Sequence, residues 1–429
     1  MERIILHIDM NSYFASVEQQ ANPFLRGKSV GVCAYLSPGG CIIASSADTK
    51  ARGIKTGCRV SEALKLDPDV VLVENEPAKY RSTTEKIFKL LAEYSDKLEP
   101  YSIDEAFLDL SGWVKNYREA KNLALEIKAR IKAEIGEWLK CSIGVSFTKF
   151  LAKFAGDIAE KDGMLVIERG NLETIFKGRD LKDAWGINYR MEARLKAIGI
   201  NNLFELKNYD PVDIKRQLGS YGYYLWANVN GREISSVARE EALPKSIGHS
   251  YCLPKKTKDK KYLLKIMYKL CEKTGRRLRS LGLEARKINF YAGYARWPGN
   301  KPDEAGDSKI ASPGGWANRP TAGGLNKLFT PGDKVFTTEE IFNPIHDFII
   351  KTEMLLPVSL LAVSVMRLAP ISGQANLFRD NLKPRSISLA MDKLNDKYGE
   401  YTVVRGLMFG ADNLARDRIG FRKTVGLKN

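Results

Sequence analysis

The chain has 429 residues, 44% of them hydrophobic and 28% charged, which is the composition of a globular protein. A chain of this length exceeds what one hydrophobic core usually supports, so we expect two to four domains. The formal net charge of +17 favours a polyanionic partner, of which nucleic acid is the commonest. The start lacks a leader pattern, and no stretch reaches the ~18 consecutive apolar residues of a membrane span. We therefore expect a cytoplasmic protein without a membrane partner.

Cysteine and histidine are too scattered to suggest a zinc site or a disulfide framework. None of the six cysteines forms a Cys-x-x-Cys pair, and the three histidines lie far apart in the sequence. Zinc sites and disulfide-rich folds use closely spaced sets of these residues. The spacing argues against both and agrees with a reducing compartment.

The N-terminal residues predict a strand that ends on a carboxylate. Residues 3–8 are largely apolar, Asp9 follows them, and residues 10–18 have helical spacing with Asn and Ser at their start. An acid at a strand-to-helix junction is most often a helix N-cap. That interpretation stays open for Asp9 taken alone.

Residues 23–76 predict a small insertion of strands and helices. Residues 29–35 and 41–44 are expected to be strands joined by a glycine-rich turn, and residues 45–57 a helix ended by glycine. This helix carries Lys50 among several basic residues. Such residues either form a solvated face or meet a ligand, and the pattern alone does not decide between the two.

A second acidic stretch occupies residues 99–110, where two predicted strands meet at a tight connection with Asp104 and Glu105 at or beside the turn. Neighbouring residues of a regular strand point to opposite faces, so adjacent carboxylates share one space only where the backbone bends. A solvated hairpin tip is the alternative. Helices predicted at 77–95 and 117–139, with a strand at 141–147, complete a mixed sheet backed by helices, an α+β arrangement.

Asp9, Asp104 and Glu105 together predict a metal site. Three carboxylates on neighbouring strands repel one another and stay ionised only with hard cations between them, and all-oxygen sites suit Mg²⁺ or Mn²⁺. Two such ions about 3.5 to 4 Å apart activate an attacking hydroxyl and hold a leaving pyrophosphate.

The second half of the chain is first helical and then strongly basic. Residues 184–200 are typical of a helical hairpin, and residues 247–367 follow the order strand, helix, strand, strand, helix, strand. A Gly- and Pro-rich insertion at 297–325 separates the middle strands. Residues 245–296 contain 15 basic and 3 acidic residues. A merely solvated surface would mix both signs, so we expect a face that follows phosphates.

These motifs resemble those of the Y-family translesion DNA polymerases. Residues 101–109 and 9–18 match the two metal-binding motifs of that family in order and spacing. The resemblance implies an α+β multidomain, right-hand polymerase. Its expected parts are a palm at 1–22 and 77–168, small fingers at 23–76, a helical thumb with a helix-hairpin-helix at 169–240, a βαββαβ little finger at 245–370 and a C-terminal tail at 371–429.

The resemblance also implies the roles of the acidic residues. Asp9 and Asp104 would bridge both metal ions, and Glu105 would hold the ion at the primer 3′-hydroxyl. The Met10 carbonyl would help to hold the nucleotide ion. These are the catalytic and metal-binding residues that we expect.

Four further residues are expected at the nucleotide. Phe14 takes the steric-gate position, which excludes a ribose 2′-hydroxyl, and Tyr13 precedes it. Lys50 matches the fingers residue that reaches the triphosphate, and the spacing around it is closer to the UmuC branch of the family than to the DinB branch. In the last palm helix Glu160 stands where the family has a triphosphate lysine, so we assign that contact to Lys161.

DNA contacts are expected in the thumb and the little finger. The hairpin turn at Gly186 and Ile187 would offer backbone N–H groups to a phosphate, with Asn188 at the position of the family's second glycine. The basic residues expected at the DNA are Lys245, Arg276, Arg277 and Arg286.

The tail carries a short motif. Residues 374–378 resemble the bacterial sliding-clamp motif, in which Gln374, Leu377 and Phe378 would enter a pocket on the clamp. Residues 383–398 follow as an amphipathic helix candidate.

The function that the resemblance implies is template-directed DNA synthesis past damaged bases, with low fidelity and without proofreading, in DNA repair, SOS mutagenesis and the response to DNA damage. The nucleotidyl group would pass from a dNTP to a primer 3′-hydroxyl with two Mg²⁺ ions. Primer-template DNA, dNTPs, the clamp and accessory mutagenesis subunits are the expected partners. The alternatives are a non-catalytic polymerase-like mutagenesis protein, whose class loses the acidic residues, and a nucleotide cyclase, which needs no basic second domain.

Overall fold

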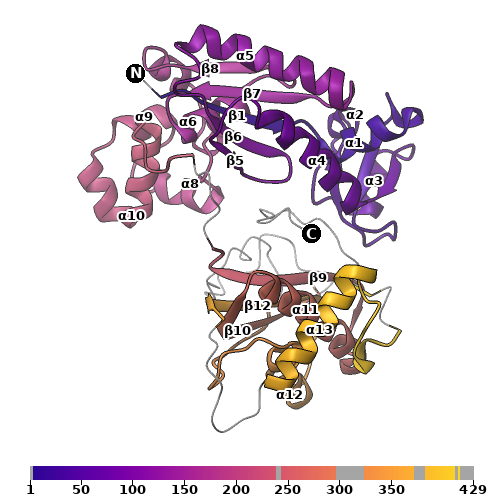
Figure 1. The fold of residues 1–429 in the computed structure, drawn as a ribbon. Helices are drawn as coiled ribbons and strands as arrows, with labels where there is room; N and C mark the ends of the chain where they lie inside the picture. Colours follow the sequence, from indigo (N-terminus) through magenta and orange to yellow (C-terminus); the bar gives the residue numbers. More distant parts are fainter. Residues whose placement is uncertain (1–2, 238–242, 296–322, 372–381, 411–413, 416–429) are drawn as a thin grey trace. The chain divides into compact units, whose positions relative to one another are not determined.

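The first unit of the computed structural model is built on a five-stranded sheet in the order β5-β6-β1-β7-β8 (Figure 1). The structure describes residues 3–237, 243–295, 323–371, 382–410 and 414–415, and the chain divides into two units between residues 242 and 243. The strands are β1 (Ile5–Met10), β5 (Leu98–Pro100), β6 (Glu105–Asp109), β7 (Cys141–Ser146) and β8 (Met164–Ile167). β1 is central and antiparallel to β6 and β7, while β7 and β8 are parallel. The predicted mixed sheet is confirmed.

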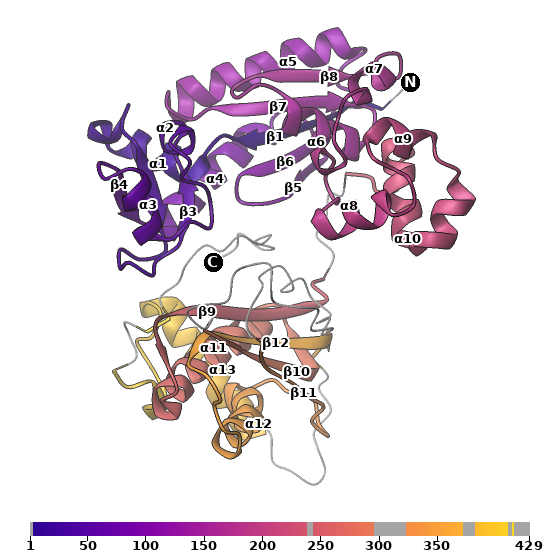
Figure 2. The same ribbon diagram turned by 180° about the vertical axis from the view of Figure 1, so that it is seen from behind.

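Helices cover both faces of this sheet. They are α1 (Tyr13–Ala21), α4 (Pro77–Leu91), α5 (Tyr117–Arg130) and α6 (Lys149–Ile158). α5 runs alongside β7 in both views (Figures 1 and 2). The helix predicted at 117–139 is shorter than expected, because it ends in a π-helical turn at Ile131–Ile135 that Gly136 terminates.

Alternation along β1 divides its side chains between the two layers. Leu6 and Ile8 belong to the core that includes residues of α1, α4 and α5, whereas Ile5 packs with Ala152 of α6. Successive strand residues point to opposite faces, so His7 and Asp9 share the α6 face with Ile5.

α6 approaches the sheet so closely that only glycine fits between them. A Cβ atom on Gly144 of β7 would lie 2.0 Å from the carbonyl oxygen of Ala152 and 2.2 Å from the backbone nitrogen of Gly156. Side chains of α6 on this face are therefore held at fixed positions beneath the strands.

Residues 23–76 form a separate small sheet in the order β3-β2-β4. Its elements are η1 (Pro23–Leu25), β2 (Val30–Cys33), β3 (Ile42–Ser45), α2 (Ala47–Ala51), α3 (Val60–Leu66) and β4 (Val71–Glu74). The helix predicted at 45–57 is only the five residues of α2, which Ser46 caps by accepting a hydrogen bond from the Thr49 backbone N–H.

Five helices follow the five-stranded sheet among the described residues up to residue 229. They are α7 (Leu172–Phe176), η3 (Leu181–Asp183), α8 (Tyr189–Lys196), α9 (Leu203–Asn208) and α10 (Pro211–Val229). Their apolar residues form one core with Phe150 and Phe154 of α6. Within the first unit, these helices therefore pack against the five-stranded sheet through α6.

The second unit has a four-stranded antiparallel sheet in the order β11-β10-β12-β9. Its elements are β9 (Ser246–Thr257), α11 (Lys260–Ser280), β10 (Leu283–Tyr294), β11 (Gly324–Phe329), α12 (Thr338–Lys351) and β12 (Val358–Pro370). The predicted βαββαβ order is confirmed. β11 begins at Gly324, so the insertion predicted at 297–325 overlaps its first two residues, while residues 296–322 are outside the described residues.

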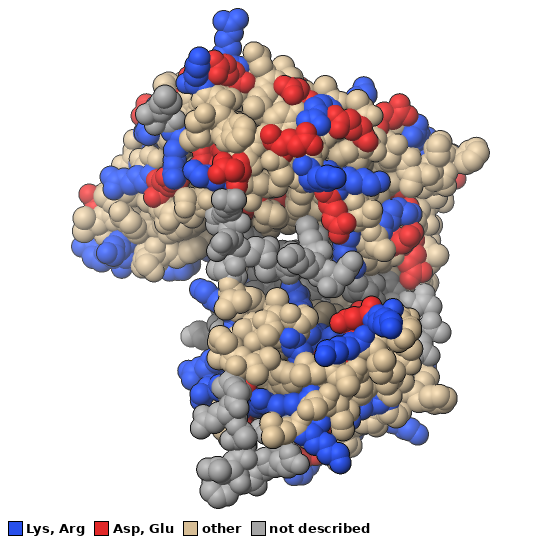
Figure 3. All heavy atoms as spheres, viewed as in Figure 1, with Lys and Arg blue, Asp and Glu red and all other residues tan. Residues whose placement is uncertain are grey.

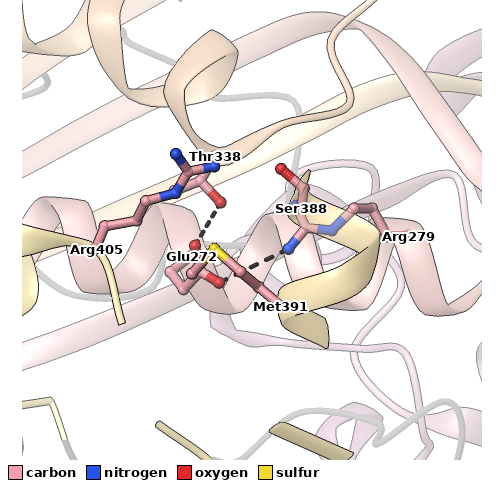
Figure 4. Close-up of a pocket in the computed structure, with 6 residues that line it drawn as sticks. All are labelled: Glu272, Arg279, Thr338, Ser388, Met391 and Arg405. Atoms are coloured by element: carbon pink, nitrogen blue, oxygen red, sulfur yellow. Dashed lines mark hydrogen bonds and ion pairs between the residues drawn. The ribbon is translucent and has the colours of Figure 1, made fainter. Parts of the chain in front are cut away.

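The helix predicted at 383–398 is present as α13 (Leu382–Tyr398), but it belongs to the second unit rather than to a free tail. It lies across α11 (Figure 1), and Met408 of the following turn η4 (Gly406–Met408) joins the core of the unit. Arg279 of α11 is 6% exposed, and its guanidinium donates two hydrogen bonds, of 2.6 and 3.0 Å, to Asp392 of α13. Figure 4 shows the same guanidinium beside Glu272, which accepts a hydrogen bond from the Thr338 hydroxyl.

No helix in the described ranges is both long enough and apolar enough to cross a membrane.

Candidate active site

The structure brings Asp9, Asp104 and Glu105 together where β1 ends and β6 begins. This edge of the five-stranded sheet is formed by strand ends and not by an outer strand. Asp9 of β1 pairs directly with Glu105 of β6, and the Met10 N–H donates to the Asp104 carbonyl over 2.9 Å. The backbone bends between β5 and β6, where the N–H groups of Tyr101 and Ser102 both donate to the Glu105 carbonyl. The predicted hairpin with both acids at its connection is confirmed.

Negative charge accumulates at this edge. Burial, with the nearby Glu105 and Asp104, raises the pKa of Asp9 to about 8. Burial and Glu105 also raise the pKa of Asp104, although its carboxylate accepts a hydrogen bond from the Ser102 hydroxyl. The raised pKa values mean that the ionised carboxylates of Asp9 and Asp104 are unfavourable next to each other and to Glu105. A bound cation would neutralise this negative charge. The donor set therefore fits divalent metal ions.

The carboxylate side chains of Asp9, Asp104 and Glu105 are not arranged around one metal position in this structure. Among the described residues, no group of three or more His, Cys, Asp or Glu side chains is arranged to hold an ion directly. The two carboxylate oxygens of Glu105 each lie near another group of the protein. One is 3.2 Å from the Lys153 ammonium and the other is 3.8 Å from His7 Nε2.

Three charged or titratable side chains that were not predicted from the sequence lie below this carboxylate. Lys153 and Asp157 lie one turn apart on α6 and form an ion pair of 3.4 Å, and His7 is fully buried on β1. Burial lowers the pKa of His7. In contrast, the pKa of Glu105 is lowered despite its burial, because His7 and Lys153 lie beside it. Strand alternation places His7 on the Asp9 face, and the spacing of four residues pairs Lys153 with Asp157, but nothing local indicates that these two faces meet.

Tyr13 and Phe14 point in different directions, as adjacent helical residues do. Tyr13 is 3% exposed, and its hydroxyl donates to the Tyr80 carbonyl over 2.9 Å and also contacts the Thr84 hydroxyl. Phe14 is half-buried and its ring stacks on that of Tyr80, with centroids 4.4 Å apart. Tyr13 therefore packs in the core, and Phe14 keeps an open side.

Lys50 and Lys161 approach each other across the same edge. The Lys50 ammonium donates to the Ser12 hydroxyl over 2.8 Å. Burial and Lys161 lower the pKa of Lys50, while Asp9 acts to raise it. α6 ends at Ile158, so Lys161 lies in the following turn rather than on the helix.

This turn is tied to the end of β1 by one side chain. The Asn11 amide oxygen accepts a hydrogen bond from the Asp162 backbone N–H over 2.7 Å, and its NH₂ group donates to the Ser142 hydroxyl over 3.0 Å. Asn11 therefore links the strand that carries Asp9 to the turn that carries Lys161.

The predicted hairpin turn has a different local structure from the one expected. Gly186 adopts a φ of 95° and its carbonyl accepts from the Tyr221 hydroxyl over 2.8 Å. The Ile187 N–H donates to the Ala184 carbonyl, and the Ile187 side chain is buried. Asn188 has a φ of −90° and caps α8 through its side chain, so it acts as a helix cap rather than as a substitute for glycine.

The four basic residues expected at the DNA have unequal environments. Lys245 and Arg286 are exposed, and Arg277 is half-buried. Arg276 forms ion pairs of 2.6 Å with Asp396 and 3.3 Å with Glu400. Arg276 is therefore paired within the second unit, and its contact with DNA stays a prediction.

The predicted clamp-binding motif lies in a part of the chain that the structure does not describe. Gln374, Leu377 and Phe378 lie outside the described residues, between the end of β12 and the start of α13. Their contact with a clamp stays a prediction, which a clamp pull-down with Leu377→Ala would test.

The chain is similar in sequence to known DNA polymerases. Residues 8–157 match the model of the impB/mucB/samB family, and residues 244–377 match the model of its C-terminal domain. Identity to DNA polymerase IV of Pelotomaculum thermopropionicum is 29% over 423 residues, which cover 98% of each chain. Identity to DNA polymerase IV 1 of Bacillus subtilis is 30% over 411 residues, which cover 94% of this chain and 92% of the relative.

Solved structures give the same fold. A Y-family DNA polymerase chimera of Dbh and Dpo4 superposes with a TM-score of 0.70 at 22% identity, covering 86% of this chain and 100% of the chimera. A Dbh ternary complex gives a TM-score of 0.53. The predicted right-hand polymerase fold is confirmed. The relatives named above are DNA polymerases IV, so they do not support a closer link of the fingers to the UmuC branch.

The raised pKa of Asp9 predicts how the stability of the metal-free protein depends on pH. In the unfolded chain the Asp9 carboxyl returns to its ordinary pKa of 3.8, while in the folded protein it titrates at about 8. Between these values the folded state binds the additional proton. The free energy of unfolding should therefore fall as pH rises, by up to about 1.4 kcal/mol per pH unit from this group.

Urea denaturation in EDTA at about pH 6 and about pH 8 would measure this effect. We expect the wild type to lose more stability over this range than Asp9→Asn, whose amide does not titrate. The same decrease in both proteins would show that Asp9 has an ordinary pKa.

Proposed function

Because the chain belongs to the Y family of DNA polymerases, we propose that Asp9, Asp104 and Glu105 form the centre of its nucleotidyl transfer from a dNTP to a primer 3′-hydroxyl. The chain is a DNA-directed DNA polymerase of the DNA polymerase IV type, which carries out translesion synthesis in DNA repair. The observation that supports our assignment is the pairing of Asp9 with Glu105, next to Asp104, at a sheet edge where the Asp9 pKa is raised.

Each residue of this edge has a distinct part in the proposal. Asp9 and Asp104 would hold both Mg²⁺ ions, Glu105 the ion nearest the primer hydroxyl, and the Met10 carbonyl the ion on the nucleotide. When bound, the two ions supply activation of the 3′-hydroxyl and stabilise the leaving pyrophosphate.

The two lysines complete the proposed nucleotide site. Lys50 and Lys161 would contact the triphosphate oxygens. Burial and then Lys161 lower the pKa of Lys50, and a polyanion bound between the two cations would relieve their repulsion, which supports this assignment.

The first experiment removes one metal-binding carboxylate. We expect Asp104→Ala to lower primer extension with Mg²⁺ by at least about a thousandfold, the scale of losing one group that stabilises transition-state charge. DNA binding should persist, because most of the net positive charge lies in residues 243–417, the second unit. Asp69→Ala removes an exposed carboxylate of residues 23–76 and serves as the control.

Extension by Asp104→Ala at a rate close to that of the wild type would overturn the assignment of the site. Loss of DNA binding in step with extension would leave a non-catalytic DNA-binding role as the better interpretation of this edge.

Sugar selection is assigned to Phe14. The phenyl ring presents bulk and no hydrogen-bond partner to a 2′-hydroxyl, which is how a site excludes a slightly larger substrate. Its stacking on Tyr80 at 4.4 Å supports a fixed ring position. Phe14→Ala should raise incorporation of ribonucleotides relative to deoxyribonucleotides by about a hundredfold, a difference of about 2.7 kcal/mol.

Tyr13→Phe is the matched control for this measurement. It removes the hydroxyl that bonds to Tyr80 and Thr84, so it should lower stability and leave sugar selectivity unchanged. Selectivity that is unchanged in Phe14→Ala would show that another residue forms the gate.

DNA contacts are proposed for the uncovered face of the second unit. β9 exposes Ser246, Gly248 and Ser250 while it buries Ile247 and Tyr251, so among the described residues of this unit one face of the sheet meets α11 and the exposed residues of β9 lie on the other. In the view of Figure 3 few acidic side chains appear on this unit, whereas acidic and basic side chains are mixed over the first.

Salt dependence of duplex binding would test this face. Removing one bond to a DNA phosphate should reduce the slope of log K against log salt by about 0.9. We expect Lys245→Ala and Arg286→Ala to weaken binding and to flatten the slope, while Lys351→Ala, an exposed lysine of α12, should change neither. If all three variants behave alike, DNA binds to another surface.

A further inference from the structure

Lys153 is a buried cation directly below the proposed metal site. Its side chain is 9% exposed, and its ammonium lies 3.2 Å from a Glu105 carboxylate oxygen and 3.4 Å from Asp157. The ammonium also lies 5.7 Å from the centre of the Tyr101 ring, where the face of the ring attracts a cation. Three groups thus surround one buried charge.

The position of this lysine follows from the backbone. α6 approaches the sheet closely at Gly144, so its inward side chains have little freedom to move. The Lys153 ammonium is paired with two carboxylates, Glu105 at 3.2 Å and Asp157 at 3.4 Å, and a buried charge remains only where it is paired in this way.

The pairing has a direct consequence for Glu105. One of its oxygens lies 3.2 Å from the Lys153 ammonium and the other 3.8 Å from His7 Nε2. Among the described side chains no group of three is arranged to hold an ion directly, and a Glu105 carboxylate that binds a metal ion would have to exchange its contact with Lys153 for that ion.

We propose that Lys153 is a positioning residue that serves as an internal counter-ion, holding Glu105 away from the metal position until a divalent cation displaces it. The proposal rests on the proposed function, because it takes Asp9, Asp104 and Glu105 as the metal ligands. A divalent cation must then break the Glu105–Lys153 contact and must bind near a like charge, and both effects weaken its affinity for the free protein.

Mn²⁺ binding to the full-length protein without DNA or nucleotide tests the proposal by a readout that does not depend on activity. Electron paramagnetic resonance counts free Mn²⁺ directly. Lys153→Met keeps the length of the side chain and removes its charge, and it should bind Mn²⁺ about tenfold more tightly than the wild type, about 1.4 kcal/mol. Lys153→Gln should behave in the same way, while Lys153→Arg should stay close to the wild type.

Lys149→Met is the matched control. Lys149 is one turn earlier on α6, is 8% exposed and pairs with Glu99 at 2.5 Å instead of with a proposed metal ligand. Its substitution removes a buried ion pair of the same helix and should leave the Mn²⁺ affinity unchanged. A purely structural role for Lys153 would make the two lysine-to-methionine variants alike.

The outcomes separate this proposal from the proposed function. Equal or weaker Mn²⁺ binding by both Lys153→Met and Lys153→Gln would overturn the counter-ion role. If Asp104→Asn still abolishes Mn²⁺ binding in that case, the metal site itself stands. If neither the wild type nor the Lys153 variants bind Mn²⁺, the counter-ion role is overturned, while primer extension by Asp104→Ala still decides the proposed function.

Discussion

Repulsion among carboxylates at the end of two paired strands is the constraint on which the site depends. Asp9 and Glu105 are direct partners in the β1–β6 ladder, and Asp104 is held beside them by the bond from the Met10 N–H. The pairing is a property of the backbone, so the acids cannot separate without unpairing the sheet. Their charge must be compensated, by protonation of Asp9, by Lys153 or by bound metal ions.

Close packing below the sheet determines which compensation is available. Gly144 allows the backbone of α6 to approach β7, and Lys153 and Asp157 then lie on the same face as His7 and Asp9. The sheet thus contributes the three carboxylates of Asp9, Asp104 and Glu105, and α6 contributes Lys153 and Asp157. A fold built for tight helix packing therefore also sets the electrostatic potential at the place where the nucleotide is expected to bind.

Local signals explain which features the sequence could predict. Asp9 is the penultimate residue of β1, Glu105 begins β6 and Asp104 directly precedes it, so strand and turn patterns in the sequence were enough to predict their places. Lys153 went unnoticed because the face on which α6 meets the sheet depends on a contact with Gly144. Arg276 was assigned to DNA from a count of charges within residues 245–296, but its partners Asp396 and Glu400 lie more than a hundred residues later. Long-range pairing of this kind leaves no local pattern.

The central claim is that the β1–β6 edge binds two metal ions. A crystal of the protein with primer-template DNA, an unreactive dNTP analogue and Mn²⁺, measured by anomalous scattering, tests it most directly. The account predicts two peaks about 3.5 to 4 Å apart, within reach of Asp9 and Asp104, with Glu105 turned away from Lys153 toward one of them. Peaks at another place, or Glu105 still paired with Lys153 beside two bound ions, would contradict it.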